Sequence, residues 1–556
     1  MNLTKRDHDH RVNKIEPTRY EWGEEAPAPR GIRTTDMGRT ASRDAWGATE
    51  TAPGIAAAFS RVPAWAIVAT IGTMIIVPSI GRWCALAPDS IAYLSTARTL
   101  YETGGLPNEF MMRPPGFPVA LAPLFLTGDL PLLAIRILLG ICFVAAGALT
   151  TVLFNRELGR RAAIAAGLLV VTNCALIHQS GVALSELLFI PLQLAALIIL
   201  DRARGGPRLT KSLSIMAGLV VSAAVLTRSL GVFLIPIGAA MILFSRTQTR
   251  RDRVVAAALF GIAAVVMPAA WQLRQSSYPI AQGYGRMWTQ AMEAEQSDAT
   301  GLSLQFERLE KFGPLRLDGI KAAMIPNTLG WRAFQSSWAS AASWLVGGAF
   351  IAIALARVLI KRSGPDAYVL ATLGALALWP WDEGVRLIVP LIPFFAGGLV
   401  WAIVGLYRKA PRPIAALSTA AVAGLLLIAH SVELGLTFER LPRTEQKAQT
   451  ELGEMQEFAK TLDRIVPPDA SILCITPNGH NAKLTVAGGA FIAKRDHVGY
   501  LDVIRHLPER PIHQPGDFVV IESSIGSLGI AEKWGISPIF WSKDLSIYGP
   551  KSIASR

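Results

Sequence analysis

The apolar run LLAIRILLGICFVAAGALTTVLF, residues 132–154, decides the fold class of this chain. Arg136 is its one charged residue, and a helix of roughly 20 such residues crosses the hydrocarbon core of a bilayer. A second run of this kind covers Val254–Ala270. Over the 556 residues, 51% are hydrophobic and 17% are charged, whereas soluble proteins carry about 25% charged residues. The sequence therefore predicts a polytopic membrane protein.

The basic residues predict the topology. The net charge of +13 could indicate a nucleic-acid partner, but Lys and Arg sit in short loops between apolar segments, as on the cytoplasmic side of membrane proteins. Five clusters of basic residues alternate with loops poor in basic residues. The clusters cover Arg156–Arg161, Arg202–Lys211, Arg246–Arg253, Arg357–Arg362 and Arg408–Arg412. Placing all five in the cytoplasm predicts about 11 transmembrane helices, a cytoplasmic N-terminus and an extracytoplasmic C-terminus. Gly116–Thr127 is then re-entrant or interfacial, because it is too short to cross.

Composition divides the chain into three regions. Residues 1–61 lack apolar periodicity and predict a disordered cytoplasmic tail. Residues 62–434 form the predicted all-α membrane domain, and residues 435–556 a small soluble extracytoplasmic α/β domain. The last region has helical spacing of apolar residues over Glu445–Val466, followed by strand-like runs at Ser471–Thr476, Phe518–Glu522 and Pro538–Trp541.

The loop between the first two apolar helices carries the most informative motif. It reads Ala87-Pro88-Asp89-Ser90-Ile91-Ala92-Tyr93-Leu94, and it closes with Arg113-Pro114-Pro115-Gly116-Phe117-Pro118. Pro88-Asp89-Ser90 favours a helix start and Gly104-Gly105 a helix stop. From these residues alone, Asp89 could be a helix cap and Arg113 an interfacial anchor.

Together with three other motifs on the outer side, this loop resembles the GT-C glycosyltransferases, and within them the protein-mannosyltransferase and aminoarabinose-transferase (PMT/ArnT-like) branch. The other motifs are Ser185-Glu186-Leu187-Leu188, Leu226-Thr227-Arg228 and Arg386-Leu387-Ile388-Val389-Pro390. The resemblance implies a GT-C-like fold and transfer of a hexose or pentose from a polyprenyl-phosphate donor. The acceptor would be a lipid, a polysaccharide or a protein on the extracytoplasmic face, and the anomeric carbon would be inverted. The compact architecture favours the inner or plasma membrane of a bacterial cell envelope.

The resemblance also assigns acid–base roles. An acceptor hydroxyl needs a base within hydrogen-bond reach, and Asp89 matches the family's aspartate. Partial burial near lipid is expected to raise the pKa of Asp89 and make it a better base. Glu186 is the second acid, which could orient the acceptor or simply occupy the first turn of its own helix.

Donor binding is assigned to arginines at the outer ends of apolar segments. A planar guanidinium engages phosphate oxygens in pairs, and Arg113, Arg228 and Arg386 all occupy such positions, with Tyr93 as a further donor-binding residue by resemblance. Their alternative role is snorkelling toward the membrane surface.

No cofactor is firmly predicted. Many family members carry a second acid directly after the first-loop aspartate, whereas this chain has Ser90, so no divalent metal is predicted at this loop. Glu186 could still help to hold one with His178.

Two other functions stay open at this stage. A transporter or flippase of a lipid-linked or small substrate would show inverted repeats and charges at mid-membrane. A non-catalytic scaffold would use the C-terminal region to bind a partner and would not need acids and arginines to converge.

Overall fold

The computed structural model describes residues 62–80, 84–107, 113–205, 211–245, 249–277, 302–325, 337–379, 383–409, 412–467, 472–476, 488–493, 498–502, 518–522, 536–541 and 545–550. The chain divides into Met1–Arg61 and Val62–Arg556, and every described residue belongs to the second unit. The predicted N-terminal tail lies outside the described residues.

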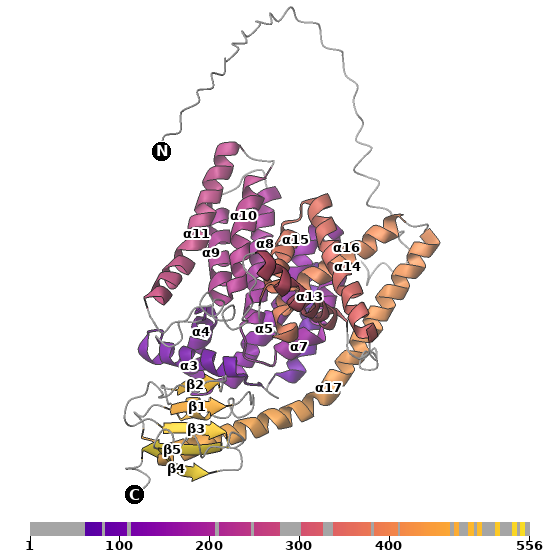
Figure 1. Cartoon of the computed structure of the whole chain (residues 1–556). Coiled ribbons are helices and arrows are strands. Elements are labelled where there is room, and N and C mark those ends of the chain that lie inside the picture. The colour runs from indigo at the N-terminus through magenta and orange to yellow at the C-terminus, as the bar shows by residue number, and fades with distance from the viewer. Residues whose placement is uncertain are drawn as a thin grey trace, which may run out of the picture. The chain divides into compact units, whose positions relative to one another are not determined.

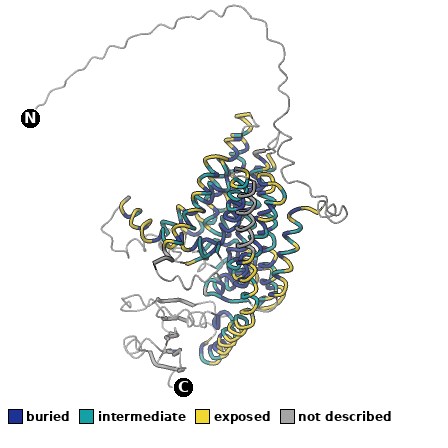
Figure 2. The backbone as a smooth tube through the Cα atoms, turned by 90° about the vertical axis from the view of Figure 1, so that its right-hand side faces the viewer, coloured by how far each residue is buried: buried dark blue, intermediate teal, exposed yellow. Residues whose placement is uncertain are grey.

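A bundle of apolar helices forms most of this unit (Figure 1). Its helices are α2 (Ala64–Ile76), α5 (Leu132–Leu158), α6 (Arg160–Val171), α8 (Glu186–Gly205), α9 (Lys211–Thr227), α10 (Leu234–Leu243), α11 (Arg250–Ser276), α13 (Leu302–Met324), α14 (Ser337–Lys361), α15 (Gly364–Ala377) and α16 (Ile392–Lys409). Helix α5 packs against α2, α6 and α8, and α9 packs between α8 and α11. Buried residues gather inside the bundle, and exposed residues follow its outer turns (Figure 2).

Among the described residues, four helices are long and apolar enough to cross a membrane: Leu132–Leu158, Arg250–Ser276, Ala341–Lys361 and Val389–Arg408. Large apolar side chains stay exposed on their outer faces, for example Ile262 on α11 and Leu345 on α14. Such exposed apolar faces suit hydrocarbon rather than water. The chain is therefore an integral membrane protein, while the count of about 11 spans stays a prediction.

Shorter elements connect the bundle helices on the predicted outer side. They are η1 (Val77–Ser79), α3 (Pro88–Thr103), α4 (Gly116–Leu121), η3 (Ala122–Thr127), α7 (Cys174–Gln179), η4 (Ser229–Phe233), η7 (Gly384–Leu387) and η8 (Val389–Leu391). The segment predicted to be re-entrant folds as α4 and η3. A helix of that length spans about 18 Å, well short of a hydrocarbon core of about 30 Å.

One long helix joins the bundle to the C-terminal sheet. Helix α17 runs without interruption over Arg412–Ile465, with Pro442 inside it, so the boundary predicted at residue 434 falls within a continuous helix. The strands that follow are β1 (Ile472–Thr476), β2 (Val498–Asp502), β3 (Phe518–Glu522), β4 (Ile536–Trp541) and β5 (Leu545–Pro550), and they pair in the order β2-β1-β3-β5-β4.

The sheet is mixed. Strand β1 pairs in parallel with β2 and β3, whereas β5 pairs antiparallel with β3 and β4. Three strands lie at predicted positions, with starts that differ by up to two residues. Strands β2 and β5 were not predicted, because VGYLD and LSIYGP contain the glycine and proline that usually mark turns.

Candidate functional site

Asp89 is presented by the first turn of α3. Ala87 is the N-cap residue of this helix, and its backbone N–H donates to Ser90 Oγ at 3.0 Å. Ser90 therefore performs the capping role, and Asp89 is not the cap that one interpretation of the sequence allowed. The helix ends as predicted, at Gly104 with φ +71°. The Asp89 carboxylate is consequently available for partners from other segments.

A short backbone bridge brings the second acid to α3. The Ala85 N–H donates to the Gly181 carbonyl oxygen at 2.8 Å, and Ala85 pairs in parallel with Val182. The segments that precede α3 and α8 are thereby joined side by side. Because Glu186 is the first residue of α8, it lies close to the start of α3.

A glycine brings two of the predicted arginines together. An added Cβ on Gly116, at the start of α4, would lie 2.7 Å from the Leu226 carbonyl carbon and 2.8 Å from the Thr227 nitrogen. The Arg113-Pro114-Pro115-Gly116 corner thus rests directly on the end of α9, where Arg228 follows. A side chain at Gly116 would separate them.

Five charged residues form one chain of alternating sign in the order Arg113, Asp89, Arg386, Glu186, Arg228. Asp89 accepts from Arg113 and, at 2.6 Å, from Nη1 of Arg386. Arg386 also donates through Nε to Glu186, whose Oε1 lies 2.8 Å from Nη1 of Arg228. These residues come from α3, the corner before α4, η7, α8 and the end of α9, so the fold gathers all the predicted charged site residues in one place.

Burial differs from one end of this ion chain to the other. The side chains of Asp89, Arg113 and Arg386 are 28%, 26% and 21% exposed. Glu186 is only 1% exposed and Arg228 13%. A ligand can therefore reach the Arg113–Asp89–Arg386 end, whereas Glu186 is enclosed between two guanidiniums.

The expectation that the pKa of Asp89 is raised is wrong, because the pKa is lowered. Burial alone would raise it, but the charges of Arg113 and Arg386, together with the hydrogen bonds they donate, outweigh burial and hold the pKa below its ordinary value of 3.8. Asp89 is thus ionised at neutral pH but is a weak base while both arginines neutralise it.

Tyr93 lies beside the same cluster, one turn after Asp89 on α3. Its ring is buried at 4% exposure, 5.3 Å from the Arg113 guanidinium, and its hydroxyl is 3.4 Å from Ser185 Oγ. Glu383 lies 3.7 Å from Arg386 at the exposed side.

The described residues do not fit a metal site. They contain no group of three His, Cys, Asp or Glu side chains arranged to hold an ion. Between Asp89 and Glu186 lies the Arg386 guanidinium, which donates to both carboxylates. His178, considered as a partner of Glu186, instead lines a separate polar cavity.

That polar cavity has a volume of about 450 Å³ and borders the ion chain through Val385, the neighbour of Arg386. Its polar lining comes from Ser79, Arg136, Asn173, His178, Gln179, His430, Glu433, Thr437, Arg440 and Thr444. Arg136 is buried and donates to Ser79 Oγ at 2.6 Å and to Ser180 Oγ at 2.9 Å. No motif in the sequence predicts this cavity, because its residues come from segments as distant as α5 and α17.

Comparisons with known proteins address the fold. No protein-family model matches the chain, and no curated protein matches it. Among the similar solved structures are two of the protein ArnT. ArnT from Cupriavidus metallidurans bound to undecaprenyl phosphate is 13% identical with a TM-score of 0.53, over 88% of this chain and 98% of that one. The apo structure of the same protein is 11% identical with a TM-score of 0.51, over 90% of this chain and 99% of that one.

At such low identity the similarity concerns the fold, and it extends through nearly the whole of the ArnT chain. The resemblance found in the outer-loop motifs is thus confirmed at the level of architecture: this chain has a fold similar to that of ArnT.

Proposed function

We propose that the protein is a glycosyltransferase that moves a sugar from a polyprenyl-phosphate donor to an acceptor on the extracytoplasmic face. The observation that carries this proposal is the position of Asp89 between two guanidiniums, at the accessible end of the ion chain. One carboxylate and two arginines at a single point provide both a proton acceptor and a phosphate site. The ArnT structure with undecaprenyl phosphate, similar in fold, supports this class of donor.

The proposed reaction is a single displacement with inversion. The acceptor oxygen forms a bond to the anomeric carbon, and the bond from that carbon to the phosphate oxygen breaks. The electron pair leaves with the polyprenyl phosphate, whose growing negative charge Arg113 and Arg386 stabilise. The acceptor's hydroxyl proton passes to Asp89.

Donor binding also solves the problem of the weak base. A phosphate that accepts hydrogen bonds from Arg113 and Arg386 competes with Asp89 for their positive charge. Burial of Asp89 is then less fully compensated, so the pKa of its carboxyl rises. The base becomes effective when the donor is in place.

The remaining residues of the ion chain act as positioning residues in this proposal. Glu186 is too enclosed to meet an acceptor, and it instead holds the guanidiniums of Arg228 and Arg386 in place. The Tyr93 ring lies against the Arg113 guanidinium and helps to hold it in position. The polar cavity beside Arg386 is the proposed place for the acceptor's polar group.

The test is transfer of radiolabelled sugar from a panel of polyprenyl-phosphate sugars in membranes that contain the protein. We expect transfer by wild type, none by Asp89→Asn, and undiminished transfer by Asp318→Asn, a matched loss of a carboxylate that is 56% exposed on α13. Equal transfer by wild type and Asp89→Asn would exclude the proposed base. Movement of labelled lipid across proteoliposomes without any transfer would instead support a flippase.

A further inference from the structure

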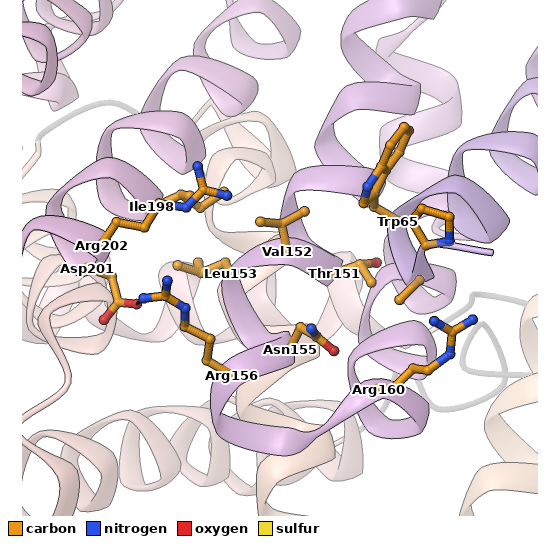
Figure 3. Close-up of a pocket in the computed structure, with 12 residues that line it drawn as sticks. Trp65, Thr151, Val152, Leu153, Asn155, Arg156, Arg160, Ile198, Asp201 and Arg202 are labelled. Carbon is orange, nitrogen blue, oxygen red and sulfur yellow. Dashed lines mark hydrogen bonds and ion pairs between the residues drawn. The ribbon is translucent and has the colours of Figure 1, made fainter. Parts of the chain in front are cut away.

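A second charged cavity lies far from the ion chain, where α2, α5, α6 and α8 meet. Its volume is about 400 Å³, and its lining includes the side chains of Arg156, Arg160, Asp201 and Arg202 (Figure 3). Arg156, Asp201 and Arg202 approach from one side, with Trp65 and Arg160 on the other (Figure 3). Asp201 pairs with Arg156 at 3.3 Å, and the lining of the cavity holds three guanidiniums and one carboxylate. A ligand for this cavity should be anionic.

An apolar groove of about 330 Å³ continues from this cavity. It shares Trp65, Val152, Ile198 and Arg202 with the charged cavity, and apart from Arg202 its lining is entirely apolar. The remaining groove residues are Ala148, Leu149, Ala195 and Ile199. One continuous site thus combines a basic compartment with a hydrocarbon-lined one.

The order of the two compartments along the helices matches the orientation of a lipid in a leaflet. On α5 the groove lies at residues 148–152 and the charges follow at residue 156, two residues before the helix ends. On α8 the groove begins at residue 195, and the charges lie at residues 201 and 202, near the last turn. The basic compartment therefore lies at the membrane surface and the groove toward the middle of the bilayer.

This site and the ion chain lie at opposite ends of α8. Glu186 opens that helix and Arg202 lies sixteen residues later, which at 1.5 Å per residue is about 24 Å along the axis. The two sites therefore face different leaflets, and a lipid held at one is not in position to react at the other.

We propose that this cavity and groove bind an anionic glycerophospholipid of the leaflet opposite the ion chain. The phosphate is held by Arg156 and Arg202, and one acyl chain lies along Val152 and Ile198. Guanidiniums suit phosphate oxygens, and basic pockets between membrane helices on the cytoplasmic side bind anionic headgroups. Arg160 completes the basic lining from α6, where it also donates to the Val62 carbonyl oxygen. The inference is independent of the proposed transferase function.

The experiment uses the full-length protein, purified in detergent and stripped of lipid. Phosphatidylglycerol, phosphatidylcholine, undecaprenyl phosphate or inorganic phosphate is added, and bound ligand is measured by native mass spectrometry. We expect phosphatidylglycerol to bind in preference to phosphatidylcholine. The Arg156→Gln/Arg202→Gln variant should bind it about a hundredfold more weakly, since each of the two lost charge-assisted contacts lowers affinity about tenfold.

Two further variants make the result specific. Arg161→Gln removes one positive charge from an exposed neighbour that does not line the cavity, and it should bind phosphatidylglycerol like wild type. Ala195→Phe fills the groove without a change of charge and should also weaken binding. Thermal unfolding of each variant identifies any that fails to fold.

Several results would overturn the assignment. Equal binding of the two phospholipids, or full binding by the double variant, would show that the basic compartment does not select phosphatidylglycerol. If undecaprenyl phosphate bound more tightly than phosphatidylglycerol, and the same variants lost that binding, the site would bind a carrier lipid and not a glycerophospholipid. Competition by inorganic phosphate with no effect of Ala195→Phe would leave an anion site without a lipid chain.

Discussion

Arg98, on the helix that carries Asp89, donates a hydrogen bond at 2.5 Å to the backbone carbonyl oxygen of Phe491, in the C-terminal region. The same guanidinium lies 3.7 Å from the centre of the Phe491 ring and donates to the Asp129 carbonyl oxygen at 3.0 Å. Arg98 is 7% exposed and Phe491 is 4% exposed. The C-terminal region is therefore bound to the helix that presents the proposed base.

Loss of this contact should loosen α3. Arg98→Ala leaves a buried carbonyl oxygen without its donor and removes the ring contact, so we expect about 2–3 kcal/mol lower stability. Hydrogen exchange over Pro88–Thr103 should become faster, and thermal unfolding followed by tryptophan fluorescence should shift downward. Lys447→Ala, which removes a lysine that is 74% exposed on α17, is the control and should change neither. Unchanged exchange in Arg98→Ala would show that α3 does not depend on Phe491.

The pH profile of transfer tests the electrostatics of Asp89. Its pKa is depressed, so in the free protein it stays ionised from about pH 5 to pH 8 and contributes no acidic limb to kcat/KM in that range. The stability that its ion pairs provide is likewise constant there and is lost only as the pH falls through the depressed pKa.

Arg113→Gln should change the shape of that profile. With one guanidinium gone, burial of Asp89 is less compensated and its pKa rises, so an acidic limb should move upward toward neutral pH. The measurement is kcat/KM against pH for wild type and variant. A variant profile that is lower but identical in shape would mean that Arg113 does not set the pKa of Asp89.

The enclosed pair of Glu186 and Arg228 should behave as one unit. Glu186→Gln leaves a buried guanidinium with reduced compensation, and breaking such a pair costs about 3–5 kcal/mol. Arg228→Met in the same chain should recover part of that loss, which a double-mutant cycle on thermal stability measures. Strictly additive losses would contradict the coupling.

A second buried cluster provides a matched control for that cycle. Arg357 is 1% exposed and pairs with Asp366 at 2.8 Å and Glu157 at 2.9 Å, between α5, α14 and α15. Arg357→Met should destabilise the protein to a similar extent but leave the KM for the donor unchanged. Glu186→Gln should raise that KM, because it releases Arg386 from its fixed position.

Gly116 should tolerate no side chain. In Gly116→Ala the new Cβ would meet the backbone of Leu226 and Thr227 at less than 3 Å, so the corner must move, and we expect a loss of about 1–3 kcal/mol together with reduced transfer. In Gly261→Ala on α11, nothing lies within 4 Å of the added Cβ. That control should be neutral or slightly stabilising in thermal unfolding, as expected for alanine in a helix.

The sequence predicted which residues join the ion chain better than it predicted how they pair. Asp89, Arg113, Glu186, Arg228 and Arg386 could be found because each stands in a polar motif at the end of an apolar segment. Their pairing could not, because it depends on the Ala85–Val182 bridge and on the contact between Gly116 and α9, which are long-range. For the same reason burial of Asp89 was foreseen, but the two arginines that reverse its effect on the pKa were not.

In the C-terminal region, too, the sequence predicts local elements but not long-range contacts. Apolar periodicity located the end of α17 and three strands, because those signals are local. The contact of Phe491 with Arg98 joins residues 393 positions apart, and no pattern in the sequence marks either of them. The proposed lipid site escaped prediction in a similar way, since its arginines were counted only as topology signals.

The alternating charges at the site also bear on turnover. Three guanidiniums and two carboxylates leave the ion chain one positive charge in excess, which a phosphodiester donor with its single negative charge would neutralise. Transfer converts that diester into a phosphate monoester of about −1.5 to −2. Asp89 takes up the acceptor's proton in the proposed transfer, and once it releases that proton to solvent the product carries more negative charge than the site can balance. Glu383 at the exposed edge adds to the repulsion. The balance of charge would thus favour binding of the intact donor and release of the spent carrier, and that release would need no conformational change.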